Sequence, residues 1–109
     1  MLRDERLARN EAFFREVNER IRDVADHFGS DEHVYEFVCE CADPNCHERL
    51  RLSLTEYEAV RADATRFVLA DGHDDLTVEA VVASAPEHVV VEKVGVAAEV
   101  ARALDPRAA

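Results

Sequence analysis

The sequence predicts one α+β domain over residues 1–109, with a long N-terminal helix and a small, largely antiparallel sheet, in the order αββαβαβα. Three observations predict this fold. Apolar residues recur at helical spacing from Phe13 to Phe28. Two later segments alternate apolar and polar residues on either side of a short turn, and β-branched residues are concentrated at residues 88–94. The length is usual for a single domain.

The first helix is expected over residues 3–28. At helical spacing, the segment has an apolar face and an opposite charged face. The apolar face carries Phe13, Val17, Ile21, Val24 and Phe28, and the charged face carries Arg15, Glu19, Arg22, Asp23 and Asp26. Gly29 fits the position that ends a helix. The first turns are polar apart from Leu7, so residues 1–12 are expected to fray or to project as an arm.

A cysteine-bearing hairpin is expected next, with strands at residues 34–41 and 48–54 and a turn at residues 42–45. Alternation places Cys39 and Cys41 on one face of the first strand. Glu36 and Glu40 then lie on the other face, where they form a solvated acidic patch with Glu48.

The second half of the chain alternates short elements. Thr55 and Glu58 form a capping box that opens a helix ending near residue 62, and a strand follows at residues 66–70. After a loop at residues 71–75, Thr77 caps a helix that ends at Pro86, with Asp74 and Asp75 as charges favoured near its N-terminus. An inner strand at residues 88–94 and a terminal helix at residues 96–104 complete the order.

The charge of the chain limits its partners. Lys and Arg number 13 against 24 Asp and Glu, a net charge of −11. Duplex nucleic acids and anionic membranes are bound through basic side chains, so neither is an expected partner. No apolar run approaches the roughly 20 residues of a membrane-spanning helix. The first residues lack the apolar segment of a secretory signal, so the cytoplasm is the expected location.

Three cysteines, Cys39, Cys41 and Cys46, lie within eight residues. Cytoplasmic thiols stay reduced, which favours metal ligands over disulfides. Zinc prefers four tetrahedral sulfur or imidazole ligands, so the cluster predicts most of a structural zinc site. The competing interpretations are cysteines that pack as small apolar side chains and cysteines that act in thiol redox chemistry.

The fourth ligand is open between His73, His47 and a water molecule. His47 follows Cys46 directly and would point to the opposite face of an extended strand. His73 lies in a glycine-containing loop that can fold against the hairpin tip, and it is favoured. A water ligand would leave an open metal site in which Glu40 or Glu48 acts as a base. Asp74 and Asp75 offer a weaker second interpretation, as acceptors that orient the His73 ring.

Several short segments form a further pattern: Phe37–Cys41 with Cys46, Tyr57–Arg61, Arg66–Val68, Gly72–His73 and Val89–Lys93. In these segments, over about residues 10–106, the chain resembles a family of small, uncharacterised proteins found mainly in actinobacteria. The resemblance implies that Cys39, Cys41, Cys46 and His73 form the ligand set and that His47 does not. It implies no activity.

The sequence therefore favours a small zinc-stabilised cytoplasmic protein with a non-enzymatic regulatory or adaptor role. Its long amphipathic first helix is the favoured surface for a protein partner or for self-association. The alternatives are a metal-dependent enzyme acting on a small molecule and a thiol redox sensor that uses Cys39, Cys41 and Cys46. The sequence contains no nucleophile elbow, phosphate loop or dinucleotide fingerprint, so no catalytic residue is assigned.

Overall fold

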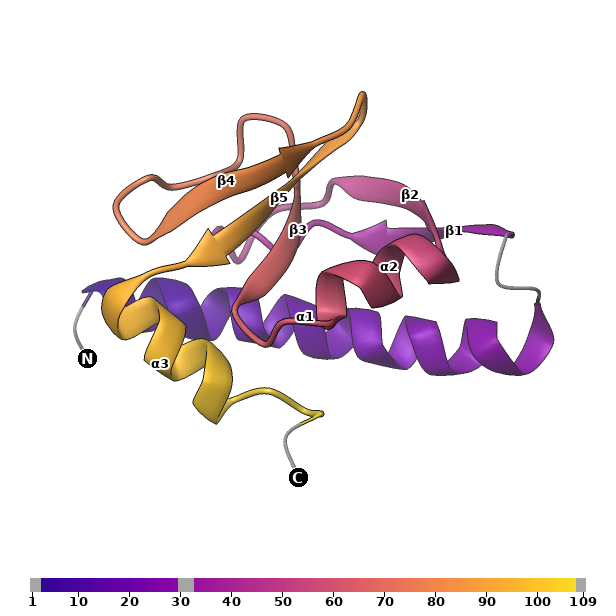
Figure 1. Cartoon of the computed structure of the whole chain (residues 1–109), viewed down its shortest axis with the longest axis horizontal. Coiled ribbons are helices and arrows are strands. Elements are labelled where there is room, and N and C mark those ends of the chain that lie inside the picture. The colour runs from indigo at the N-terminus through magenta and orange to yellow at the C-terminus, as the bar shows by residue number, and fades with distance from the viewer. Residues whose placement is uncertain (1–2, 30–32, 108–109) are drawn as a thin grey trace.

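The computed structural model describes residues 3–29 and 33–107, and their elements run in the order αββαβββα (Figure 1). The helices are α1 (Arg3–Phe28), α2 (Leu54–Arg61) and α3 (Gly95–Ala103). The strands are β1 (Val34–Val38), β2 (Arg49–Ser53), β3 (Arg66–Ala70), β4 (Glu79–Ser84) and β5 (His88–Lys93). The fold is α+β with a long N-terminal helix, as predicted.

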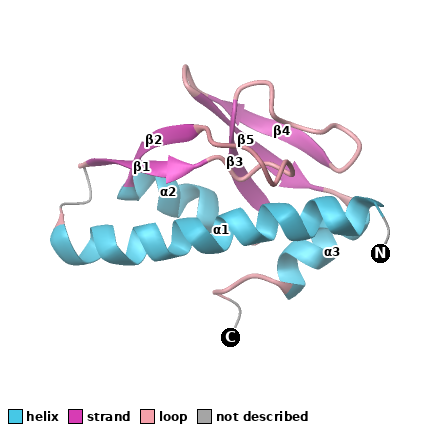
Figure 2. Cartoon of the chain, turned by 180° about the vertical axis from the view of Figure 1, so that it is seen from behind, coloured by secondary structure: helices cyan, strands magenta, loops and turns pink. Residues whose placement is uncertain are grey.

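The strands form two small antiparallel sheets rather than one, a β1–β2 hairpin and a sheet in the order β3-β5-β4. The two sheets meet at Glu40, whose backbone N–H donates to the Val68 carbonyl at 2.9 Å and whose carboxylate accepts from the Val68 N–H at 3.0 Å. The long helix α1 runs the length of the molecule, with both sheets on one side of it (Figures 1 and 2).

The predicted helix from Thr77 to Pro86 is wrong, because this segment contains strand β4. β4 pairs with β5 in an antiparallel register that places Val81 opposite Val91. Thr77 does not cap a helix, since its N–H and hydroxyl both donate to the Asp75 carboxylate in a turn before the strand. Periodicity alone does not separate a short valine-rich strand from a helix, and pairing with β5 decides the outcome here.

The buried face of α1 also differs from the prediction. Phe13 and Val24, expected inside, are each 61% exposed, whereas Arg15 and Asn18 have no exposed surface. Residues 3–12, expected to fray or project, belong to α1, and Ala8 is buried in a cluster with Ala97 of α3 and with Val78, which precedes β4. No helix among the described residues is long and apolar enough to cross a membrane.

Buried charges take the place of apolar side chains on this face of α1. Lys93 of β5 forms ion pairs with Glu11 of α1 and Glu79 of β4, and all three side chains are buried. Arg15 donates to the carbonyl of Ala101 in α3 at 2.7 Å. The Lys93 ammonium and the Arg15 guanidinium thus each have a carboxyl or carbonyl group beside them, which lowers the cost of burying a charge.

The main core lies between α1, α2 and the sheets, and its largest fully buried apolar side chains are Phe37, Leu52, Tyr57, Phe67 and Leu69. The rings of Phe37 and Tyr57 stack with centroids 4.5 Å apart. Cys39 and Cys41 belong to the same core cluster, so the cysteine-bearing segment is anchored by its packing.

Two helix ends differ in detail from the prediction. The capping box of α2 is formed by Ser53 and Glu56 rather than by Thr55 and Glu58, so the helix begins two residues earlier than expected. Gly29 is not needed for a left-handed backbone. A Cβ atom at this position would lie 1.4 Å from the Tyr35 hydroxyl, so a larger residue here would make the Tyr35 ring shift.

Candidate metal centre

Strand β1 positions the first two cysteines. The ladder with β2 continues past Val38, because the Cys39 N–H donates to the Glu48 carbonyl at 3.1 Å. Residues two apart on an extended segment point to the same side, so Cys39 and Cys41 present their sulfurs together. Both cysteines are buried.

Two turns bring in the other two side chains. The Asp43 carboxylate accepts from the Asn45 N–H at 2.9 Å, and the Asp43 carbonyl accepts from the Cys46 N–H at 3.1 Å, which folds the hairpin tip back. After β3, Gly72 has φ +82°, a left-handed conformation that glycine adopts without strain. This turn directs His73 towards the cysteines.

The four candidate ligand atoms are the sulfurs of Cys39, Cys41 and Cys46 and a ring nitrogen of His73, and all lie within 4.8 Å of one another. His73 Nδ1 is 3.6 Å from the Cys39 sulfur and 3.6 Å from the Cys46 sulfur. Sulfur and nitrogen ligands of a tetrahedral zinc ion, at about 2.3 and 2.0–2.1 Å from the metal, are themselves about 3.6 Å apart. The cluster could therefore hold a metal ion.

An ion can reach the cluster from solvent. Cys46 and His73 are accessible, and a cleft of about 620 Å³ beside the cluster is lined by Cys41, Asp43 and His73, among others. Cys39 closes the inner side, where its sulfur accepts from the Ala70 N–H at 3.1 Å. The site thus has a fixed inner wall and an open outer side.

The thiols do not share charge equally. The contact with Cys39, helped by His73 and by the backbone N–H of Asp43, lowers the pKa of Cys41 to about 5 against the opposing effect of burial. The contact with Cys41, together with burial, raises the pKa of Cys39, and burial raises that of Cys46. The contacts within the cluster therefore favour a thiolate, and a bound cation would displace the remaining thiol protons.

The structure brings together Cys39, Cys41, Cys46 and His73, the set that the sequence favoured. His47 is exposed and does not belong to the cluster. Asp75 does not orient the His73 ring, because its carboxylate accepts from Thr77 and pairs with Arg3 at 3.1 Å.

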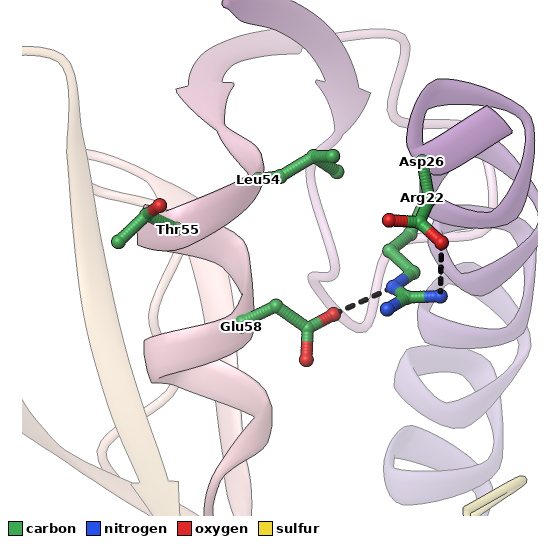
Figure 3. Close-up of a pocket in the computed structure, with 5 residues that line it drawn as sticks. All are labelled: Arg22, Asp26, Leu54, Thr55 and Glu58. Atoms are coloured by element: carbon green, nitrogen blue, oxygen red, sulfur yellow. Dashed lines mark hydrogen bonds and ion pairs between the residues drawn. The ribbon is translucent and has the colours of Figure 1, made fainter. Parts of the chain in front are cut away.

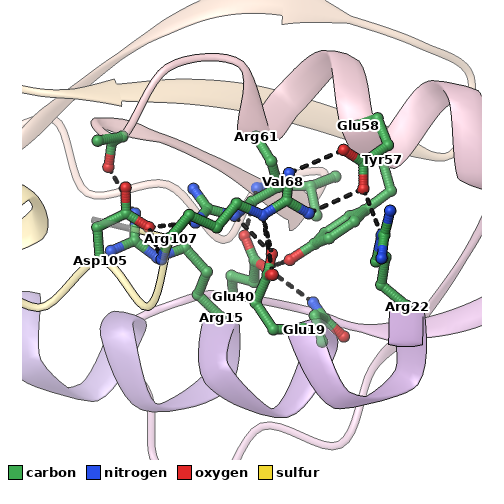
Figure 4. Close-up of polar contacts among 12 residues, drawn as sticks. Arg15, Glu19, Arg22, Glu40, Tyr57, Glu58, Arg61, Val68, Asp105 and Arg107 are labelled. Carbon is green, nitrogen blue, oxygen red and sulfur yellow. Dashed lines mark hydrogen bonds and ion pairs between the residues drawn. The ribbon is translucent and has the colours of Figure 1, made fainter. Parts of the chain in front are cut away.

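Glu40 is the residue beside the site that sequence reasoning placed wrongly. Expected in a solvated patch, it is fully buried, on the side of the chain opposite Cys39 and Cys41. Its carboxylate accepts from the Tyr57 hydroxyl at 3.0 Å (Figure 4). It also accepts from the Asn18 amide at 2.8 Å. The only sequence signal was an acidic residue between two core positions, and strand alternation gave that signal the wrong meaning.

Asn18 also closes part of the outer edge of β1. Its amide oxygen accepts from the Val38 N–H at 2.8 Å, and its amide nitrogen donates to the Val38 carbonyl at 2.8 Å. The side chain therefore satisfies both backbone groups that a neighbouring strand would use. Glu40 and Asn18 together fix the segment that carries Cys39 and Cys41.

A second hollow, of about 300 Å³, lies between α1 and α2 and is lined by Arg22, Asp26, Leu54, Thr55 and Glu58 (Figure 3). Its charged groups satisfy one another, because Arg22 donates to Glu58 at 2.7 Å and lies 3.7 Å from Asp26. Arg107, which follows α3, pairs with Glu58 at 2.8 Å, and its hydrogen bond is the main cause that lowers the pKa of Glu58 to about 2 (Figure 4). The charged residues around this hollow therefore form a structural ion-pair network rather than a ligand site.

Comparison of the chain with protein-family models, curated proteins and solved structures finds no match. The chemistry of the cluster is therefore argued from its own residues.

Proposed function

We propose that the protein binds one structural zinc ion through the sulfurs of Cys39, Cys41 and Cys46 and through Nδ1 of His73. The observation that carries this proposal is the pair of 3.6 Å distances from His73 Nδ1 to two sulfurs, since they match the spacing of ligands around tetrahedral zinc. Hard cations such as calcium and magnesium prefer oxygen ligands. Iron–sulfur clusters normally need four cysteines.

The ligand chemistry supports a structural role. Three thiolates and an imidazole complete a closed tetrahedral shell, whereas a catalytic zinc keeps a position for water and rarely has so many sulfur ligands. The site would join the end of β1, the hairpin tip and the loop after β3. A bond between such distant parts of the chain restricts the unfolded state and stabilises the fold. The expected cytoplasmic setting would keep the thiols reduced.

The biological role that we propose is a non-enzymatic regulatory or adaptor protein that acts through protein contacts. The exposed apolar side chain of Val24 on α1 supports a contact role. Membership of the actinobacterial family that the sequence resembles is part of the same proposal.

Metal analysis of protein purified without chelator tests the zinc site. We expect one zinc per chain and lower thermal stability after chelation. Cobalt substitution should give the absorption of a tetrahedral, thiolate-rich site. The variant His73→Ala should bind zinc at least about tenfold more weakly, because removal of a ligand opens the shell. The matched variant His47→Ala should bind zinc like the unmodified protein.

Two results would contradict the proposal. Full zinc affinity in His73→Ala would exclude His73 as the fourth ligand. Metal-free protein that reversibly forms a disulfide of Cys46 with Cys39 or Cys41 would favour the redox alternative. The variant Cys46→Ser separates these cases, because it loses both metal and stability only if Cys46 is a ligand.

A further inference from the structure

The outer edge of β1 is only partly covered. The N–H of Cys39 donates to β2, whereas the backbone of Val38 bonds to Asn18 and that of Glu40 bonds to Val68 on the opposite edge. Because backbone groups alternate between the two edges of a strand, the N–H and C=O groups of Val34 and Glu36 point to this outer edge as well. No hydrogen bond among the described residues fills these positions.

An apolar groove of about 490 Å³ lies along this open edge, between α1 and β1. We call it the α1–β1 groove, and its lining includes Val17, Arg20, Ile21, Val24, Tyr35 and Glu36. Val24 is 61% exposed, and Ile21 and Tyr35 are partly exposed at the margin of the main core. The groove therefore combines unpaired strand backbone with an apolar wall.

We infer that the α1–β1 groove binds an extended segment of a partner protein, rich in alternating apolar and basic residues, as an added strand beside β1. This inference specifies the partner contact of the proposed function and rests on that part of it. Backbone hydrogen bonds to Val34 and Glu36 would align the added strand. Its alternate side chains would contact Ile21 and Val24, since side chains of a strand alternate between its faces.

Charge selects this occupant over a second copy of the chain. The net charge is −11, so two copies repel each other, while a basic segment is attracted. Glu36, the acidic residue of the groove lining, is exposed in β1. Arg20, the basic lining residue, lies 3.7 Å from Glu16. A purely apolar small molecule would leave the strand edge without hydrogen bonds.

The test titrates metal-loaded protein with a fluorescent peptide of about eight residues, the length of a short strand, in which valine alternates with lysine and threonine. We expect saturable binding that protects the Glu36 amide from hydrogen exchange. The same peptide with glutamate in place of lysine should bind at least about tenfold more weakly, because it loses the charge complementarity.

Two matched pairs of variants locate the site. Val24→Arg should weaken peptide binding at least about tenfold, whereas Phe13→Arg, the same change at an equally exposed position outside the groove lining, should leave it unchanged. Val34→Pro removes an outward N–H at the first residue of a strand, where proline is tolerated, and should weaken binding. Val34→Thr keeps that N–H and should not.

Three outcomes would overturn the inference: no saturable binding up to about 1 mM peptide, binding that is unaffected by Val24→Arg, or a dimer that is disrupted by Val24→Arg and not by Phe13→Arg. The last outcome would make a second copy the occupant. If peptide binding fails while one zinc per chain is retained, the metal proposal stands. If peptide binds to protein that never takes up zinc, only the metal proposal fails.

Discussion

Glu40 shows how a single buried carboxylate can organise the fold around a candidate metal site. All three of its hydrogen-bond partners are donors: the Asn18 amide, the Tyr57 hydroxyl and the Val68 N–H. They come from α1, α2 and β3. Burial raises the pKa of Glu40, and the three donors oppose that shift. One acceptor-only group therefore holds three elements at the segment that carries Cys39 and Cys41.

The variant Glu40→Gln should destabilise the protein by about 1–3 kcal/mol. The glutamine NH₂ group is a donor, and it would face one of the three donors that the Glu40 carboxylate accepts from. The measurement is urea unfolding at neutral pH. Glu36→Gln, an isosteric change at an exposed position of β1, serves as the control and should lie within about 0.5 kcal/mol of the unmodified protein. Equal stabilities of the two variants would contradict the role assigned to Glu40.

The candidate site was predictable to different degrees residue by residue. The spacing of Cys39, Cys41 and Cys46 was enough to predict a cluster, and Gly72 made the loop with His73 the better source of a fourth ligand. Glu40 was not predictable, since its main partner Asn18 lies 22 residues earlier on a helix. Local alternation carries no information about a polar partner supplied by another element.

At the scale of elements, the sequence predicted correctly those helices and strands whose own residues determine their structure. The bounds of α1 and β3 agree with their predictions, because helical spacing and a bounded apolar run identify them. β4 was missed because Val81 pairs with Val91 in a distant strand. The buried face of α1 was missed because Arg15 is satisfied by Ala101, far along the chain. Tertiary pairing decided both cases.

The N-terminus of α2 gives a prediction at this scale. The Ser53 hydroxyl accepts from the Glu56 N–H at 3.1 Å, and the Glu56 carboxylate accepts from the Ser53 N–H at 2.9 Å. Ser53→Ala should therefore lower the free energy of unfolding by about 1 kcal/mol. Ser84→Ala, at an exposed position in β4, is the matched control in the same denaturant titration. If both changes are neutral, this capping box does not stabilise α2.

For the whole molecule, the buried group of Glu11, Glu79 and Lys93 makes stability depend on pH. Burial, more than the neighbouring Glu79, raises the pKa of Glu11 from 4.5 to about 9, although Lys93 opposes the shift. The folded protein thus keeps a proton that the unfolded chain releases near pH 4.5. The stability from this group is fully present below pH 4.5 and is lost as pH rises towards about 9.

Urea unfolding at several pH values across this window measures the effect. We expect the unmodified protein to lose stability from pH 5 to 9, a range set by the pKa of Glu11. Glu11→Gln, which resembles the protonated carboxyl, should flatten the profile. An equally steep profile in Glu11→Gln would assign the pH dependence to another group. Glu58 affects stability in a separate pH range. Its pKa is lowered from 4.5 to about 2, so the stability from its ion pairs is lost only as pH falls from about 4.5 towards 2.

The buried charges of α1 also bear on when the protein can fold. Glu11 and Arg15 leave the ribosome well before Lys93 and Ala101, the residues that satisfy them. Until Lys93 and Ala101 have emerged, α1 lacks part of its partner surface, and its apolar side chains face solvent or a chaperone. The domain therefore completes its structure only after Ala101 has been made, and a chain cut before β5 leaves α1 without the partners of Glu11 and Arg15.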